Sequence, residues 1–276
     1  MIQKTTTRYT KTNTNLDNLS ITKSDLYQFG CEFEFYIDTK RYDFKKAISN
    51  IQQQISSFCH TDILVDLTQI PTDKDRYACM QIKPDLSLED NGIEISTPIT
   101  TKYGIKHYIT HILPIIEEYG YTNEDTGLHF HISTTQKDGI NFNFYLYMLM
   151  CHDKGLLSSW QPRIGYSQNV MDILSQHTKN ISREIKTKKG TIWNLEKIES
   201  NHIEVKSIGG LDYHKHINKI LQEFEMYVYC FNSTLNHSDP RYRQKLIDEH
   251  KRLIQDIDNT TKTEFIKAID EAGLRL

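Results

Sequence analysis

The chain has 276 residues, of which 38% are hydrophobic and 25% charged, so it is long enough for one large domain or two small ones. Its formal charge of -3 gives no overall basic field, and we expect no bulk binding of nucleic acid. The sequence has neither an apolar run of about 18 residues nor a signal-peptide pattern at its start, so we expect no association with membranes. Five scattered cysteines without a C-x-x-C pair indicate reduced thiols and a cytoplasmic protein.

Residues 1–24 are polar, rich in Thr, Asn and Lys, and carry no hydrophobic period. This composition predicts an N-terminal arm. No repeat or low-complexity linker divides the remainder, so we expect one domain over residues 25–276, with a helical C-terminal portion from about residue 212. The composition is typical of a bacterial or phage genome of low GC content.

The segment from Gly30 to Asp38 alternates strictly and predicts a strand. Cys31, Phe33, Phe35 and Ile37 fall on one side of it, and Glu32, Glu34, Tyr36 and Asp38 fall on the other. The two glutamates are roughly 6.6 Å apart on a strand, a separation at which carboxylates can bind a hard cation. A half-buried strand with a solvated acidic face explains the same pattern.

Periodicity predicts the remaining elements in chain order. Helical spacing covers residues 43–58, 103–119, 141–151 and 212–235, with Pro114 expected to kink or break the second helix. Further helices are expected over residues 241–256 and 262–272. Strand patterns cover residues 61–69, 77–82, 92–98, 126–133 and 201–210, with a loop over residues 83–89.

Three of these strands repeat the design of the first, burying apolar residues on one side and presenting polar groups on the other. The polar sides carry Glu94, then His129 with His131, then Glu204 with Lys206. Taken singly, each group has an ordinary explanation: a surface carboxylate, solvated imidazoles, or an ion pair on one strand. If the strands belong to one curved antiparallel sheet, all these groups lie on one concave face.

Clustered carboxylates repel each other unless cations neutralise them. Several glutamates without cysteine ligands indicate Mg²⁺ or Mn²⁺ rather than structural zinc. Arg163, in the loop of residues 160–169, and Lys206 add positive charge suited to phosphate chemistry. The basic segment of residues 179–189 is either a solvated loop or a lid over an anionic ligand.

The sequence blocks resemble the amidoligase family, which is related to glutamine synthetase and glutamate–cysteine ligase. The resemblance covers about residues 29–231, and its blocks are Gly30–Glu34, Asp85–Ser87 leading into Gly92–Pro98, Gly127–His131 and Ile203–Lys206. The family usually has arginine where this chain has Lys206, which keeps the charge but loses bidentate geometry.

The resemblance implies an α+β fold, with a curved antiparallel sheet of the glutamine synthetase type around an ATP site and helices flanking it. It implies an ATP- and Mg²⁺-dependent (or Mn²⁺-dependent) carboxylate–amine ligase that works through an acyl phosphate. Its substrates would be a small amine and a small-molecule, peptide or protein carboxylate, and an oligomer would fit the family. The implied metal ligands are Glu32, Glu34, Glu94, His129 and Glu204.

The same resemblance assigns the remaining roles. Glu34, Arg163 and Lys206 would be catalytic, and the nucleotide would be held by Glu32, His129, His131, Arg163 and Lys206. Asp85 and Ser87 would shape the substrate side of the pocket. Two alternatives stay open: a non-catalytic nucleotide-binding or assembly module of the same fold, and a metal-dependent hydrolase that activates water with the His/Glu cluster.

Overall fold

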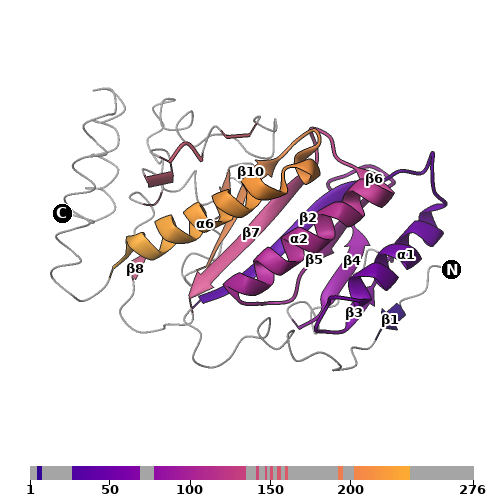
Figure 1. Cartoon of the computed structure of the whole chain (residues 1–276), viewed down its shortest axis with the longest axis horizontal. Coiled ribbons are helices and arrows are strands. Elements are labelled where there is room, and N and C mark those ends of the chain that lie inside the picture. The colour runs from indigo at the N-terminus through magenta and orange to yellow at the C-terminus, as the bar shows by residue number, and fades with distance from the viewer. Residues whose placement is uncertain are drawn as a thin grey trace. The chain divides into compact units, whose positions relative to one another are not determined.

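The computed structural model describes residues 5–7, 27–68, 78–134, 141–142, 147, 150–151, 154–156, 159–160, 192–194 and 202–236. The chain forms two compact units, the first made of Met1–Ser133 with Ile208–Leu221 and the second of Thr134–Ser207 with Gln222–Leu276. The described strands are β1 Thr5–Thr7, β2 Tyr27–Ile37, β3 Ile63–Val65, β4 Met80–Pro84, β5 Gly92–Ser96, β6 Gly120–Tyr121, β7 Gly127–Thr134, β8 Asn141–Phe142, β9 Trp193–Asn194, β10 His202–Gly209 and β11 Leu235–Asn236 (Figure 1). The described helices are α1 Phe44–Ser56, α2 Lys102–Tyr119, α6 Ile217–Thr234 and the short 3₁₀ helix η3 Tyr213–Lys215.

The first unit contains an open sheet with the strand order β1-β3-β4-β5-β2-β7, and β6 also pairs with β2. The pairs β1–β3, β4–β5, β2–β5 and β2–β6 are antiparallel, whereas β3 and β4 run parallel. The predicted α+β class with a mostly antiparallel sheet is therefore confirmed. The glutamine synthetase type of that sheet stays a prediction.

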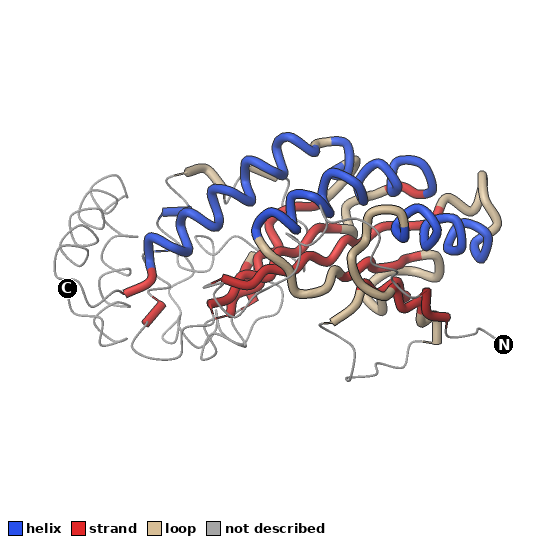
Figure 2. Tube along the Cα trace, turned by 60° about the horizontal axis from the view of Figure 1, so that its bottom comes forward, coloured by secondary structure: helices blue, strands red, loops and turns tan. Residues whose placement is uncertain are grey.

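One face of this sheet is predominantly apolar and is covered by α1 and α2 (Figures 1 and 2). Alternation on β2 places its apolar residues on this face, and all are at most 1% exposed: Cys31, Phe33, Phe35 and Ile37. The α2 helix adds a fully buried stripe of Ile105, Tyr108, Ile109, Ile112, Leu113 and Ile116. This burial supplies the main stabilising term of the unit and leaves the opposite face of the strands for polar side chains.

Both helices begin at side-chain caps. The Asp43 carboxylate accepts a hydrogen bond from the backbone N–H of Lys46, and the Thr101 hydroxyl accepts one from Gly104. The α2 helix continues through Pro114 to Tyr119, so Pro114 does not break the helix, and the kink expected as the other outcome stays a prediction.

Two of the strand boundaries that differ from the predictions in the first unit have a local chemical reason. The strand expected over residues 61–69 is confined to Ile63–Val65, because Asp66 turns the chain by accepting bonds from the backbone and hydroxyl of Thr68. The loop expected from Lys83 begins later, since β4 extends to Pro84. Proline fits there because β3 pairs with β4 only as far as Ile82, so no ladder bond to β3 is lost.

The second unit pairs β9 with β10 and β8 with β11, both antiparallel. The helix predicted over residues 141–151 was wrong at its start, since Asn141–Phe142 is a strand; further on, Tyr147, Met150 and Cys151 are helical and buried. Local apolar density could not reveal the pairing of β8 with residues almost a hundred positions later.

Buried polar bonds and buried thiols complete the described interior. In the second unit, Tyr227 donates a hydrogen bond to the carbonyl of Leu156 at 3.2 Å and lies 2.6 Å from the hydroxyl of Ser207. All five cysteines are reduced and buried: Cys31, Cys59, Cys79, Cys151 and Cys230. None of the helices in the described ranges combines the length and the apolar character needed to cross a bilayer.

The predicted N-terminal arm lies mostly outside the described residues, but Thr5–Thr7 form β1 against β3. The helices predicted over residues 241–256 and 262–272 also lie outside the described residues. The structure does not test the predicted single domain over residues 25–276, which stays a prediction.

Candidate metal centre

Strand register gathers the polar side chains of the first unit on one face of the sheet. In the antiparallel pair of β2 and β5, Glu34 lies opposite Glu94 and Glu32 lies opposite Ser96. Residues directly opposite each other in such a pair point to the same side. The expectation that Glu32, Glu34 and Glu94 share a face is therefore met by the register.

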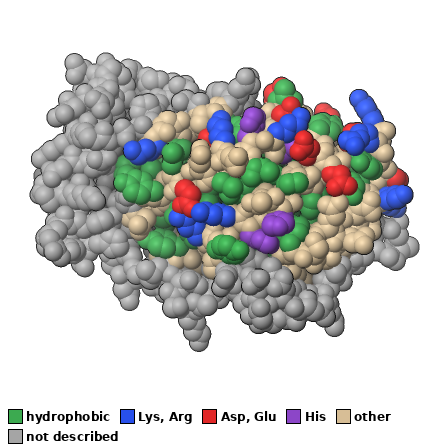
Figure 3. Space-filling model, viewed as in Figure 1, with side chains coloured by type: hydrophobic (Ala, Val, Ile, Leu, Met, Phe, Trp, Pro, Cys, Tyr) green, Lys and Arg blue, Asp and Glu red, His purple; other side chains and the backbone are tan. Residues whose placement is uncertain are grey.

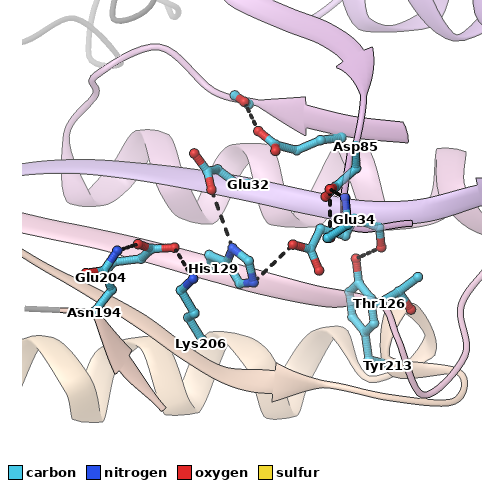
Figure 4. Close-up of polar contacts among 12 residues, drawn as sticks. Glu32, Glu34, Asp85, Thr126, His129, Asn194, Glu204, Lys206 and Tyr213 are labelled. Atoms are coloured by element: carbon cyan, nitrogen blue, oxygen red, sulfur yellow. Dashed lines mark hydrogen bonds and ion pairs between the residues drawn. The ribbon is translucent and has the colours of Figure 1, made fainter. Parts of the chain in front are cut away.

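The next strand, β7, brings an imidazole between the two glutamates of β2 (Figure 4). The Nδ1 atom of His129 lies 3.4 Å from Oε2 of Glu32, and its Nε2 atom lies 3.2 Å from Oε1 of Glu34. Glu34 and His129 are buried, with relative exposures of 6% and 7%. One ring thus links both carboxylates and fixes their spacing.

His131, two residues along β7, points to the same face. Its Nε2 atom lies 3.3 Å from Oε1 of Glu32, so this carboxylate has an imidazole at each oxygen. Burial acts against ionisation of Glu32, but the electrostatic attraction of His131 and hydrogen bonds with His129 and His131 hold its pKa well below the ordinary value. Glu32 is consequently a carboxylate anion at neutral pH.

Glu94 behaves in the opposite way. Burial and the negative charge of Glu32 raise its pKa to about 7, although Lys83 and Ser96 act in the other direction. The ammonium of Lys83 lies 3.0 Å from Oε1 of Glu94, and the hydroxyl of Ser96 donates to the same oxygen. Without a cation, Glu94 is therefore protonated in a substantial fraction of the molecules at neutral pH.

A hydrogen bond from another element also holds the backbone of β2 at Glu34. The hydroxyl of Tyr213, from η3, donates a hydrogen bond of 2.9 Å to the carbonyl oxygen of Glu34 (Figure 4). Tyr213 is fully buried, so the bond is shielded from water. This contact holds the Glu34 segment of the strand in place.

Asp85 and Ser87, predicted on the substrate side, form a turn between β4 and β5. Oδ1 of Asp85 accepts hydrogen bonds from the backbone N–H of Ser87 at 2.8 Å and from its hydroxyl at 2.7 Å. This is an Asx-type turn, which shapes the loop from within. Their predicted substrate contact stays a prediction.

Glu204 and Lys206 belong to the second unit, on β10. The Lys206 ammonium lies 3.3 Å from Oε1 of Glu204, and the Asn194 amide donates to Oε2 of Glu204 at 2.7 Å (Figure 4). The ion pair considered from the strand pattern therefore exists. The predicted roles of Glu204 as a metal ligand and of Lys206 at phosphate stay predictions, while Arg163 and residues 179–189 lie outside the described residues.

The donor set of the first unit suits a divalent cation. Three carboxylates supply the oxygen ligands that Mg²⁺ and Mn²⁺ prefer, and the imidazole nitrogens favour Mn²⁺ or a later transition metal. A cation would also relieve the repulsion that raises the pKa of Glu94. Glu32, Glu34 and Glu94 are the residues of this unit whose oxygens would hold it, and His129 would join them through a ring nitrogen released from Glu32 or Glu34.

Lys83 was not expected on this face, whereas Ser96 was expected on the side of Glu94 but was given no role. Lys83 was assigned to a loop because of the neighbouring Pro84, and only the register of β4 against β5 places it opposite Glu94. Ser96 lies two residues after Glu94 on the same strand, so strand alternation alone predicts that both side chains point to the same face.

The sequence matches no known family model and no curated protein.

Proposed function

We propose that the protein is an ATP- and Mg²⁺-dependent carboxylate–amine ligase. The observation that carries the proposal is the group of three glutamates and two histidines on one face of β5, β2 and β7. The resemblance of the sequence blocks to the amidoligases supports the same conclusion. Together they favour nucleotide chemistry over a purely structural acidic face.

In the proposed reaction, a substrate carboxylate oxygen attacks the γ-phosphorus of ATP, and ADP leaves. The amine then attacks the acyl phosphate, and the products are an amide, phosphate and a proton. Bound Mg²⁺ would neutralise the phosphate charge during transfer. The protein's contribution at this step is positioning and electrostatic stabilisation.

The chain's own residues have separable tasks in this proposal. Glu32, Glu34 and Glu94 would bind the metal cation on the sheet face. His129 keeps the two glutamates of β2 at a fixed spacing. Lys83 forms an ion pair with Glu94, which partly neutralises this carboxylate and fixes its orientation on the sheet face. Arg163 and Lys206 are assigned to phosphate and substrate charge by the sequence resemblance.

The deciding experiment incubates the protein with Mg-ATP and with pooled amines and acids, followed by analysis of nucleotides and of new masses. ADP together with an amide mass supports the ligase. AMP with pyrophosphate contradicts it, because adenylate chemistry has a different leaving group. Omission of Mg²⁺ with added chelator is the matched control.

Two other functions give distinct results in the same assay. A metal-dependent hydrolase cleaves substrates without ATP, and the presence of two imidazoles beside the carboxylates is the observation that favours it. A non-catalytic nucleotide-binding module binds Mg-ATP in a titration but yields neither ADP nor an amide.

A further inference from the structure

A second pair of histidines lies on the helical side of the first unit, remote in sequence from the metal centre. His107 and His111 are one turn apart on α2, with ring centroids 4.2 Å apart and an interplanar angle of 39°. Residues four apart on a helix share one face. Histidine side chains reach the molecular surface on the side where α2 lies (Figures 1 and 3).

Both rings rest on Phe58, at the end of α1. The centroid distances to Phe58 are 5.8 Å for His107 and 4.9 Å for His111. Phe58 is only 8% exposed, so it is itself held by the core. The two imidazoles are therefore supported by a fixed aromatic surface instead of moving independently in solvent.

Hydrogen bonds to backbone carbonyls determine the tautomer of each ring. Nε2 of His107 lies 3.1 Å from the carbonyl oxygen of Phe58, and Nδ1 of His111 lies 2.7 Å from the carbonyl oxygen of His107. A carbonyl oxygen can only accept, so each of these nitrogens donates its proton. In the neutral rings, Nδ1 of His107 and Nε2 of His111 then carry lone pairs.

These two nitrogens make no hydrogen bond with the part of the chain that the structure describes. His111 is exposed and His107 partly so, which gives an ion access from solvent. Histidines that bind metals almost always donate their other N–H to a carbonyl, a carboxylate or water, which fixes the ring for coordination. Paired histidines four apart on a helix are also the spacing of zinc-binding helices.

We propose that His107 and His111 form a surface chelate on α2 for a borderline transition-metal ion, with Zn²⁺ as the representative. Two imidazole donors without a carboxylate select Zn²⁺, Cu²⁺ or Ni²⁺ over Mg²⁺. Two protein ligands leave coordination positions for water or for an exogenous ligand. The chelate is independent of the proposed ligase activity.

A shared ion requires the two donor nitrogens to lie close together. With Zn–N bonds of about 2.1 Å and tetrahedral angles, the two donor nitrogens are roughly 3.4 Å apart. The two ring centroids are 4.2 Å apart, a distance of the same order as this separation.

Calorimetric titration with ZnCl₂ tests the chelate in metal-stripped protein and in buffer without imidazole or amine ligands. The carboxylate–histidine centre also binds such ions, so we expect one Zn²⁺ site besides it, and this second site should weaken at least about tenfold in His107→Gln and in His111→Gln. His216→Gln is the matched control, because it removes another exposed histidine outside α2 and keeps the site. Zn²⁺ binding unchanged in both α2 variants, or weakened equally in His216→Gln, overturns the proposal.

A second measurement uses the unmodified protein and so does not depend on the folding of variants. Zn²⁺ should shift the ring ¹H–¹³C signals of His107 and His111 together, with the signals assigned in the unmodified protein by through-bond experiments. A shift confined to the signals of His129 and His131 places the ion at the other site and overturns the α2 chelate.

Discussion

Glu34 and Glu94 lie directly opposite each other in the antiparallel pair of β2 and β5. Like charges in this position destabilise a sheet, and both side chains are largely removed from water. Burial and the charge of the neighbouring Glu32 raise the pKa of Glu94, so this strand pair favours either a proton on Glu94 or a cation beside it. This choice links the stability of the protein to pH and to divalent ions.

Glu94→Gln should stabilise the metal-free protein above neutral pH. The folded pKa of Glu94 is about 7, above its ordinary 4.5, so the folded state binds the extra proton between these values. The contribution of protonated Glu94 to the free energy of unfolding is therefore fully present below pH 4.5 and is lost as pH rises through 7. Urea unfolding in chelator should show a loss on the order of 1 to 3 kcal/mol between pH 5 and pH 8, absent in the variant. Identical pH profiles would contradict the assignment.

Glu34→Gln should abolish Mg²⁺-dependent turnover of ATP while leaving the fold intact. The amide keeps the shape of the side chain but removes the negative charge next to His129. ADP production should fall to background, and Mg²⁺ or Mn²⁺ affinity should weaken at least about tenfold. Glu89→Gln, an exposed carboxylate in the loop before β5, is the matched control and should keep full turnover. Undiminished turnover in Glu34→Gln excludes the metal role of Glu34.

His60 should make the protein sensitive to acid. Burial, assisted by the neighbouring His107, lowers the pKa of His60 to about 4, and its Nδ1 atom lies 2.5 Å from the hydroxyl of the buried Tyr108. The unfolded chain binds a proton below about 6.5, whereas the folded chain does so only near 4, so stability is lost as pH falls through this window. Between pH 7 and pH 5 we expect a loss of about 1 kcal/mol that is smaller in His60→Gln. His216→Gln should follow the unmodified protein.

Gly92→Ala should destabilise the loop that carries Asp85. A Cβ atom at residue 92 would lie 2.2 Å from Cβ of Leu88 and 3.0 Å from the carbonyl oxygen of Glu89. Relief of that contact requires movement of the backbone, with an expected loss of about 1 to 3 kcal/mol in chemical unfolding. Gly30→Ala is the control, because its Cβ would meet His131 at an ordinary 3.5 Å. An equal loss in both variants would count against the loop explanation.

Alternation was a reliable guide wherever a strand has one purely apolar face. The faces of β2 and β7 were predicted residue by residue, because Phe33 and Phe130 are each followed by a polar group of opposite orientation. The burial of that polar face was not predictable. A solvated acidic face was one explanation of the pattern, but Glu34 and His129 are both buried.

Features that depend on pairing were not predictable from local pattern. The β1 strand consists of three threonines, which give no apolar alternation, and its partner β3 fixes its register. Lys83 enters the site only because β4 and β5 pair with Lys83 opposite Glu94. Such long-range register is decided by contacts across the sheet, and a single sequence window does not contain them.

The burial of all five cysteines has a practical consequence for spectroscopy. Thiols react with maleimides as thiolates at accessible positions, and burial raises the pKa of the Cys31, Cys59 and Cys151 thiols. The folded protein therefore offers a nearly unreactive thiol background. A single cysteine introduced at an exposed position such as Lys40 could carry one fluorophore without removal of any native residue, and the later labelling of native cysteines would report the rate at which the core opens.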